Sequence, residues 1–424
     1  MLTVPYIREN KDIVLARLAK KNFRQIELID SIIALDDKRK EIQFKSDSLL
    51  AEMNTISKAV GALFQQGKKE EANQAKEKTS QLKEEIKILA EQMDEVSAKL
   101  QEILVVVPNL AHDSVPPGKS SADNIKVREG GSLPVLTANA VPHWDLASKY
   151  DIIDFELGNK LTGAGFPVYK GKGAKFQRAL INFFLEEAIN AGYREFMPPL
   201  MVNEDSGFGT GQLPDKEGQM YHVGLDNFYL IPTAEVPVTN IFRDVILSAD
   251  ELPVKCTAYT PCFRREAGSY GKDVRGLNRL HQFDKVEIVQ IVHPDKSYET
   301  LETMVTHVES IVRKLELPYR ILRLCGGDMS FTSALTYDFE VYAAAQDKWL
   351  EVSSVSNFES FQANRLKCRF KETGDKKTRL VHTLNGSALA LPRIVAAILE
   401  NNQTEKGIKV PSVLIPFTGF EYID

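Results

Sequence analysis

The feature that most constrains the fold is a pair of long heptad seams near the start of the chain. The first seam steps by alternate fours and threes from Leu28 to Leu63, with polar interruptions at Arg39 and Ser46. After a break at residues 65–67, the same spacing resumes from Ala75 to Ile103. Such spacing is typical of helices that pack along one apolar stripe. The sequence therefore predicts an antiparallel helical hairpin whose first helix is on the order of 54 Å long.

Lysines on the outer faces of this hairpin alternate with acidic residues. A net charge of −5 excludes a globally basic surface for nucleic acid, so any RNA contact must be local. Two interpretations remain open. The hairpin is a solvated coiled coil, or its lysines contact the phosphates of a structured RNA that is recognised by shape and backbone. The lysines concerned are Lys38, Lys40, Lys45, Lys58, Lys68, Lys69, Lys76 and Lys83.

The hairpin pattern ends at Pro108, and the composition predicts three parts in the chain. Residues 1–108 form the arm, residues 109–125 form a Pro- and Ser-rich linker, and residues 126–424 form a larger domain. The apolar run at 103–107 is far too short to span a bilayer, and no signal-peptide pattern opens the chain. We therefore expect a cytoplasmic protein with no membrane contact. The scattered cysteines and histidines give no support for a disulfide framework or a zinc site.

Two amphipathic helices are expected to form part of the scaffold of the larger domain. One begins at Lys175 and places Phe176, Leu180, Phe183, Phe184 and Ile189 on its apolar stripe. The other follows Asp295, and its stripe consists of Leu301, Met304, Val305, Val308, Ile311, Val312 and Leu315.

The most informative segment, residues 255–292, reads as two strands around a Gly-rich turn at 267–277. Alternation places Cys262, Arg264 and Glu266 on one face of the first strand, and Arg279, His281, Phe283, Lys285 and Glu287 on one face of the second. Paired as a hairpin, the strands would present arginines for phosphates, a ring for stacking and carboxylates for an ammonium. A surface sheet that carries ion pairs and one exposed ring is equally compatible with this alternation.

Several strings in the chain resemble the signature motifs of class II aminoacyl-tRNA synthetases in the form found in seryl-tRNA synthetases. FRREAG at 263–268 with RGLNRLHQFDKVE at 275–287 resembles motif 2, GYREFMPPL at 192–200 resembles motif 1, and NGSALALPRIVAAILEN at 385–401 resembles motif 3. GTGQLP at 209–214, PTAE at 232–235 and EVSS at 351–354 are similar to further seryl-family strings. The resemblance implies an α+β fold, in which helices flank an antiparallel sheet of the class II type, preceded by a tRNA-binding helical arm.

The resemblance also implies where ATP and Mg²⁺ bind. Arg264 would hold the α-phosphate, Arg279 and Arg393 would reach the γ-phosphate, and these arginines would act catalytically by stabilising charge on the phosphoryl oxygens. Phe283 and Arg393 would sandwich adenine, while Glu266 and the backbone at Leu280 would meet its polar edge. The string at 351–354, consisting of Glu351, Val352, Ser353 and Ser354, would also line the nucleotide site, with Glu351 and Ser354 as the magnesium ligands. Because their three-residue spacing does not fit period 2, we expect a strand end or a bulge there.

By the same resemblance, the amino-acid pocket takes L-serine. Its residues would be Thr233, Ala234, Glu235, Arg264, Glu287, Asn385 and Ser387. The implied reaction forms seryl-adenylate and pyrophosphate from serine and ATP, and then transfers the seryl group to the 3′ end of serine tRNA bound by the arm. Neither step requires a protein nucleophile. The family further implies a homodimer, through motif 1, and the chain resembles the common bacterial-like type because the region lacks a zinc-ligand Cys set.

Two other functions are weighed against this one. A synthetase-like ligase that loads a carrier protein would lack the long arm. A scaffold protein built on an inactive synthetase body would have no need for the complete set of Arg264, Glu266, Arg279, Glu351 and Arg393. The C-terminal residues from Val410 onward depart from the family's usual pattern, which leaves the role of this tail open.

Overall fold

The computed structural model describes residues 1–136, 139–215, 218–266 and 275–424, and the chain forms two compact units. Unit 1 comprises residues 1–19 and 23–108, and unit 2 comprises residues 20–22 and 109–424. Most of the Gly-rich turn expected at 267–277 lies outside the described residues. Among the described residues, no helix is both long enough and apolar enough to cross a membrane.

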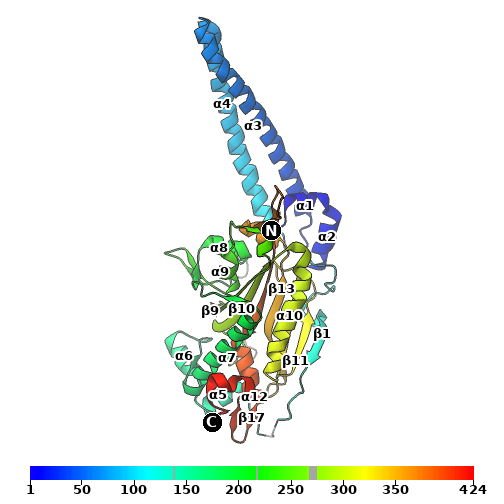
Figure 1. Cartoon of the computed structure of the whole chain (residues 1–424), viewed down its shortest axis with the longest axis vertical. Coiled ribbons are helices and arrows are strands. Elements are labelled where there is room, and N and C mark those ends of the chain that lie inside the picture. Colours follow the sequence, from blue (N-terminus) through cyan, green and yellow to red (C-terminus); the bar gives the residue numbers. More distant parts are fainter. Residues whose placement is uncertain (137–138, 216–217, 267–274) are drawn as a thin grey trace. The chain divides into compact units, whose positions relative to one another are not determined.

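Unit 1 is helical, and its largest feature is the expected hairpin. Helices α1 (Val4–Glu9) and α2 (Lys11–Lys20) precede the long helices α3 (Glu27–Gln65) and α4 (Lys69–Leu104), which lie side by side (Figure 1). All of the predicted seam positions are buried or half-buried, whereas most other positions are exposed. With 39 residues, α3 is about 58 Å long. The heptad spacing therefore predicted both helices and the faces on which they meet.

A buried carboxylate fixes α1 to the base of α3. Asp36 lies within 3.0 Å of the guanidinium groups of Arg8 and Arg39 and 2.7 Å from the ammonium of Lys40. Burial alone would raise the pKa of Asp36, but the hydrogen bonds from Lys40, Arg39 and Arg8 outweigh it and lower the pKa to about 2. A carboxylate surrounded by three cations stays ionised without solvent.

Unit 2 is built on one large sheet. Among the described residues, eight strands form it in the order β1-β11-β12-β13-β16-β10-β9-β4, and all neighbours are antiparallel except the parallel pair of β4 and β9. Their bounds are β1 Ile125–Gly130, β11 Tyr319–Arg323, β12 Leu335–Ala343, β13 Lys348–Asn357, β16 His382–Ala390, β10 Gln282–Val292, β9 Val254–Phe263 and β4 Arg194–Glu195. This arrangement confirms the predicted fold class.

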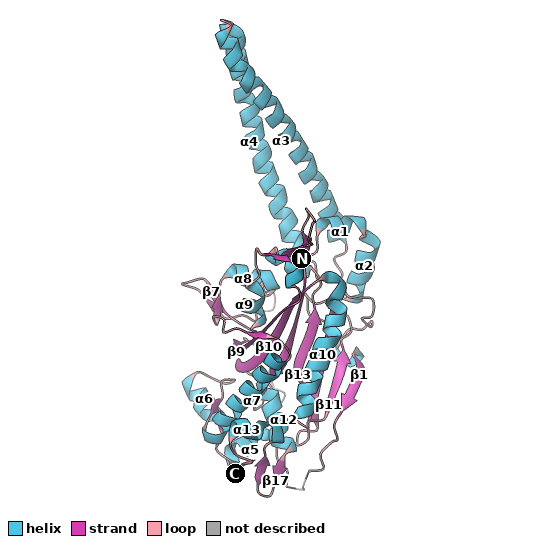
Figure 2. Cartoon of the chain, viewed as in Figure 1, coloured by secondary structure: helices cyan, strands magenta, loops and turns pink. Residues whose placement is uncertain are grey.

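Three helices cover one face of this sheet. Figure 2 shows α7 (Gly171–Asn190), α10 (Ser297–Lys314) and α12 (Leu391–Asn401) against its strands. Every predicted stripe residue of α10 is buried in the core, as are the four predicted before Ile189 in α7. Ile189 itself is 40% exposed, so its expected place on the stripe is wrong. In the last turn of α7 it is the neighbouring Ala188 that is fully buried in the core, so the stripe passes one position before Ile189.

Shorter elements surround the sheet. The remaining helices are α5 His143–Lys149, α6 Phe155–Leu161, α8 Glu204–Thr210, α9 Glu235–Asn240, α11 Phe361–Leu366 and α13 Ile415–Thr418. Small sheets are formed by β2 Ile153–Asp154 with β3 Val168–Tyr169, by β5 Met201–Val202, β7 Phe228–Leu230 and β6 His222–Val223, by β15 Arg379–Leu380, β14 Arg369–Lys371 and β8 Ile246–Ser248, and by β17 Gln403–Thr404, β18 Gly407–Lys409 and β19 Tyr422–Ile423.

The two strands of the informative segment pair as predicted but are shorter than expected. β9 ends at Phe263 and β10 begins at Gln282, where the two residues lie opposite each other. Arg264 and Glu266 therefore follow the first strand, and Arg279 precedes the second. The alternation argument holds for Phe283, Lys285 and Glu287, which lie within β10.

Candidate active site

The predicted site residues of the central strands share the sheet face that the helices leave uncovered. In β10, Val286 and Ile288 pack in the core beneath the helices, so Lys285 and Glu287 point to the opposite face. Ser387 of β16 lies opposite Glu287 and points the same way, because its neighbour Ala388 belongs to that core. The central strands therefore bring their polar residues together on one surface.

A buried cluster of charged and hydroxyl groups lies on this face. The ammonium of Lys285 is 2.6 Å from Glu287 Oε2 and donates a hydrogen bond of 2.8 Å to Thr233 Oγ1. The hydroxyls of Thr233 and Ser387 each donate to Glu287 Oε2 at 3.4 Å. All four side chains are more than nine-tenths buried. Glu287 thus has a cation and two hydroxyl donors in place of water.

A second buried carboxyl, Glu235 at the start of α9, completes the cluster. Its Oε1 accepts a 2.6 Å hydrogen bond from Gln362 Nε2. Burial, followed by the negative charge of Glu287, raises the pKa of Glu235 to about 7, against the opposing effects of Gln362, Lys285 and Arg264. Two acids with one lysine leave one negative charge uncompensated when Glu235 ionises. A ligand ammonium is the group that would balance that charge.

The arginines predicted to bind phosphate lie at or beyond the strand ends. The guanidinium of Arg264 lies over the ring of Phe283, 5.2 Å from its centroid, and its Nε donates to the carbonyl of Pro232 at 3.3 Å. Arg279 is paired with Glu266, so these two predicted ATP residues contact each other. All of these side chains are half-buried or exposed, and can therefore be reached by a ligand.

The third arginine, Arg393 near the start of α12, is held by two carbonyls. Its Nε donates to the carbonyl of Asn278 at 2.9 Å, and its Nη1 donates to the carbonyl of Glu351 at 2.8 Å. These contacts tie α12 to β13 and to the residues before Arg279. Arg264 covers the Phe283 ring in the structure, and the sandwich of adenine between Phe283 and Arg393 stays a prediction.

A β-bulge lies where the sequence spacing predicted a strand irregularity. Ser353 pairs with Phe339, but Glu351 pairs with Glu340, so Val352 is the extra residue on β13. The bulge puts Glu351 and Ser354 on the same face, and Ser354 Oγ lies 3.4 Å from Glu351 Oε1. The side chain of Val352 packs in the helix-covered core, and the hydroxyl of Ser353 donates to the carbonyl of Ser387 at 2.6 Å. Neither side chain is free to bind a nucleotide.

Asp338 of β12 lies directly opposite Ser354 and was not predicted from the sequence. Burial and the charge of Glu351 raise its pKa well above the usual range. Its Oδ1 is buried and accepts no hydrogen bond from the described residues. The carboxylates of Asp338 and Glu351 and the hydroxyl of Ser354 therefore converge here, and the carboxylate of Asp338 has an unused oxygen. Hard oxygen donors of this kind suit Mg²⁺ that is also held by phosphates.

The described residues contain no cluster of three or more His, Cys, Asp and Glu side chains arranged for a metal ion. The Glu351–Asp338 pair is thus suited only to a cation that takes its remaining ligands from a substrate and water. Among the other predicted residues, Leu280 and Ala234 are buried, Ala234 caps the start of α9, and Asn385 of β16 is half-buried. Sequence reasoning placed Lys285 on the site face but gave it no role, and it gave no sign of Gln362.

Comparison with known proteins agrees with this geometry. Residues 1–111 match the model of the seryl-tRNA synthetase N-terminal domain, and residues 221–402 match that of the class II tRNA synthetase core domain of the G, H, P, S and T enzymes. The serine–tRNA ligase of Salinibacter ruber is 50% identical over 424 residues, covering 100% of this chain and 99% of that protein. The serine–tRNA ligase of Geobacter sulfurreducens is 46% identical, covering 99% of each chain.

A crystal structure of seryl-tRNA synthetase from Pyrococcus horikoshii complexed with ATP superposes with a TM-score of 0.92 at 34% identity, covering 99% of each chain. The likeness thus extends over both units and over the whole sheet that carries the site. This chain belongs to the seryl-tRNA synthetase family.

Proposed function

We propose that this chain, a serine–tRNA ligase by family, binds L-serine in the buried cluster around Glu235 and Glu287. The observation that carries the proposal is the charge of that cluster, in which two acids face one lysine. The ammonium of an amino acid would balance the uncompensated charge. The hydroxyls of Thr233 and Ser387, with Asn385 nearby, offer partners for a substrate hydroxyl. A pocket built to hydrogen-bond a hydroxyl rejects an analogue without one by about 10⁴-fold.

ATP is proposed to bind beside the serine pocket, against Arg264, Phe283, Arg279 and Arg393. The carboxylate of serine attacks the α-phosphorus and pyrophosphate leaves, so negative charge gathers on the phosphoryl oxygens. Guanidinium groups held in place before the reaction stabilise that charge without reorganising. In the second step the terminal 3′-hydroxyl of the tRNA takes the acyl group. Binding ATP requires Arg279 to exchange its contact with Glu266 for phosphate oxygens, which are also anionic.

Glu351 and Ser354, with Asp338 on the neighbouring strand, are proposed to hold Mg²⁺. When bound, Mg²⁺ would neutralise part of the negative charge of the phosphates. The unused Oδ1 of Asp338 and its repulsion from Glu351 support the assignment, because a cation relieves both. Glu351 and Ser354, the two magnesium ligands that the family resemblance implies, point to the same face because Val352 forms a bulge between them.

The hairpin of α3 and α4 is proposed to bind serine tRNA through its lysines. All eight lysines named for the arm are exposed. Lys40, Lys45 and Lys68 form ion pairs within the arm, with Asp36, Glu41 and Glu71 respectively. The other five form no ion pair in the described part of the chain and are therefore the best placed to contact phosphates; they are Lys38, Lys58, Lys69, Lys76 and Lys83. The match of residues 1–111 to the family's N-terminal domain argues against a ligase that loads a carrier protein.

A homodimer in the cytoplasm is proposed as the working form. The segment after β4 exposes apolar side chains, of which Met197 is 91% exposed and Met201 is 50% exposed. Met197 belongs to the string at 192–200 that resembles motif 1, and an exposed apolar surface of this kind favours burial in an interface. The domain boundaries at residues 108 and 125 remain our proposal for how arm, linker and catalytic domain divide.

The test of the serine assignment is ATP–pyrophosphate exchange by the full chain with each of the twenty amino acids, in the presence of Mg²⁺ and without tRNA. We expect exchange with serine, none with alanine, and only weak exchange with threonine. Exchange with alanine at a rate near that of serine would overturn the proposed role of the pocket hydroxyls. No exchange with any amino acid would favour a scaffold function.

A further inference from the structure

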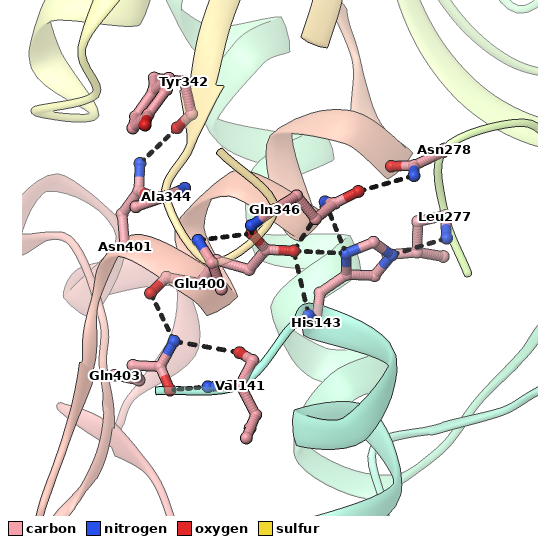
Figure 3. Close-up of polar contacts among 11 residues, drawn as sticks. Val141, His143, Leu277, Asn278, Tyr342, Ala344, Gln346, Glu400, Asn401 and Gln403 are labelled. Atoms are coloured by element: carbon pink, nitrogen blue, oxygen red, sulfur yellow. Dashed lines mark hydrogen bonds and ion pairs between the residues drawn. The ribbon is translucent and has the colours of Figure 1, made fainter. Parts of the chain in front are cut away.

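A buried network behind the proposed ATP site centres on His143 of α5 and Glu400 of α12, whose side chains are both fully buried (Figure 3). His143 Nδ1 lies 2.7 Å from Glu400 Oε1, and the backbone N–H of His143 donates to the same oxygen at 3.0 Å. On the other side of the ring, the backbone N–H of Leu277 donates to His143 Nε2 at 2.9 Å. Because Nε2 accepts, the ring proton is assigned to Nδ1, which donates to Glu400.

A second branch of the network runs through the turn between β12 and β13. Gln346 Nε2 donates to Glu400 Oε1 at 2.7 Å, and Asn278 Nδ2 donates to Gln346 Oε1 at 2.8 Å. The carbonyl of Asn278 in turn accepts from Arg393 Nε at 2.9 Å. Both branches therefore lead from Glu400 to residues 277 and 278. These residues directly precede Arg279, and Asn278 holds Arg393 through its carbonyl.

The packing leaves little room for residues 275–278 to move. Gly276 has a φ of +66°, and a Cβ at this position would lie 2.3 Å from His143 Nε2. The guanidinium of Arg275 lies over the Trp144 ring, 4.7 Å from its centroid. The backbone is thus pressed against the imidazole, and the ring is the contact that sets its position.

We propose that His143 is a positioning residue for ATP activation. Through Nε2 it fixes the backbone at Leu277, so that the chain leading to Arg279 and the Asn278 carbonyl that holds Arg393 keep their places when the triphosphate binds. Preorganised charges stabilise a transition state without a reorganisation cost, and a small displacement of them lowers the rate. The inference rests on the proposed ATP site, and nothing in it requires His143 to touch the substrate.

Two substitutions of His143 separate positioning from simple core packing. In His143→Gln, the side-chain carbonyl can reach the place of Nε2 and accept from Leu277. In His143→Asn, the shorter amide can donate to Glu400 but cannot reach Leu277. Exchange would be measured on the full chain at saturating serine while ATP is varied. His143→Asn should raise the KM for ATP about tenfold because a buried N–H loses its acceptor. His143→Gln should restore it to within about threefold of the wild-type value.

Asn278→Ala provides a milder second test, since it removes the bond to Gln346 and keeps the carbonyl that holds Arg393. The KM for ATP should rise about threefold with the KM for serine unchanged, and the melting temperature should fall, because Gln346 Oε1 loses its buried donor. Equal KM values for ATP in His143→Asn and His143→Gln, or a lowered melting temperature with an unchanged KM for ATP, would overturn the positioning role. Arg393→Ala tests the ATP site independently. If it leaves the KM for ATP unchanged, the site assignment itself is wrong.

Discussion

Serine binding should depend on pH through the ionisation of Glu235. Burial and the nearby charge of Glu287 raise the pKa of Glu235 from 4.5 to about 7, which corresponds to about 3 kcal/mol against ionisation in the empty pocket. The ammonium of serine favours the ionised carboxyl. Serine should therefore bind most tightly above pH 7 and release a proton from Glu235 when it binds below that pH. With one coupled proton, the Kd at pH 6 should be about tenfold higher than at pH 8.

Isothermal titration calorimetry of the wild-type chain with serine at pH 6, 7 and 8 measures this dependence. Repeating the pH 6 titration in buffers of different ionisation enthalpy counts the proton released. The matched control is Glu235→Gln, which keeps an acceptor for Gln362 and has no charge to titrate. It should bind serine weakly at every pH, with a Kd that hardly changes between pH 6 and pH 8.

The stability of the empty protein provides a second check on the same group. The folded-state pKa of Glu235 lies above its unfolded value, so the folded chain carries an extra proton between about pH 4.5 and 7, and the stabilisation from that proton is lost as pH rises through this window. Glu235→Gln should thus gain stability over wild type at pH 8 but not at pH 5. A wild-type Kd that is equal at pH 6 and 8, or an unaltered slope in Glu235→Gln, would refute the reasoning.

Other predictions separate the remaining parts of the proposal. Deleting residues 28–103 should leave serine-dependent exchange largely intact and severely reduce tRNA charging; equal loss of both activities would contradict the separate role of the arm. Arg264→Ala should reduce exchange by about 100-fold because it removes charge-assisted hydrogen bonds to phosphate, and near-normal exchange would exclude that contact. Asp338→Asn should raise the Mg²⁺ concentration needed for half-maximal exchange, while an unchanged magnesium curve would separate Asp338 from the metal. Met197→Glu should shift sedimentation from dimer toward monomer, and a wild-type profile would place the interface elsewhere.

Local repeats predicted the scaffold better than they predicted the site. The seam from Leu28 to Leu63 and the stripe of α10 were predictable because each depends only on spacing within one helix. The bulge was predictable because Glu351 and Ser354 are expected to bind the same ion. Two residues three positions apart cannot share a face of a regular strand. Phe283, Lys285 and Glu287 were predictable as one set because alternate residues of a single strand point to the same face.

What the sequence could not predict depends on contacts between distant segments. Gln362 contacts Glu235 from 127 residues away, and the charge balance with Lys285 appears only after β10 and α9 are packed together. Asp338 becomes relevant because the register of β12 against β13 places it beside Ser354. Strand ends were also missed, since Arg264 and Arg279 lie beyond the paired region.

The bulge in β13 reconciles the three-residue spacing of Glu351 and Ser354 with the two-residue repeat of a strand. Val352 is an extra residue in β13, so that Glu351 and Ser354, which are three positions apart, face the same way. Replacing Val352 with alanine would remove part of a buried side chain and keep the bulge. Removing Val352 would leave Glu351 and Ser354 two positions apart, which is the spacing at which a regular strand places both side chains on one face, and the bulge would disappear. At the present three-residue spacing a strand without the bulge would turn one of the two side chains toward the helices, so it is the bulge, and not the identity of Val352, that keeps both on one face.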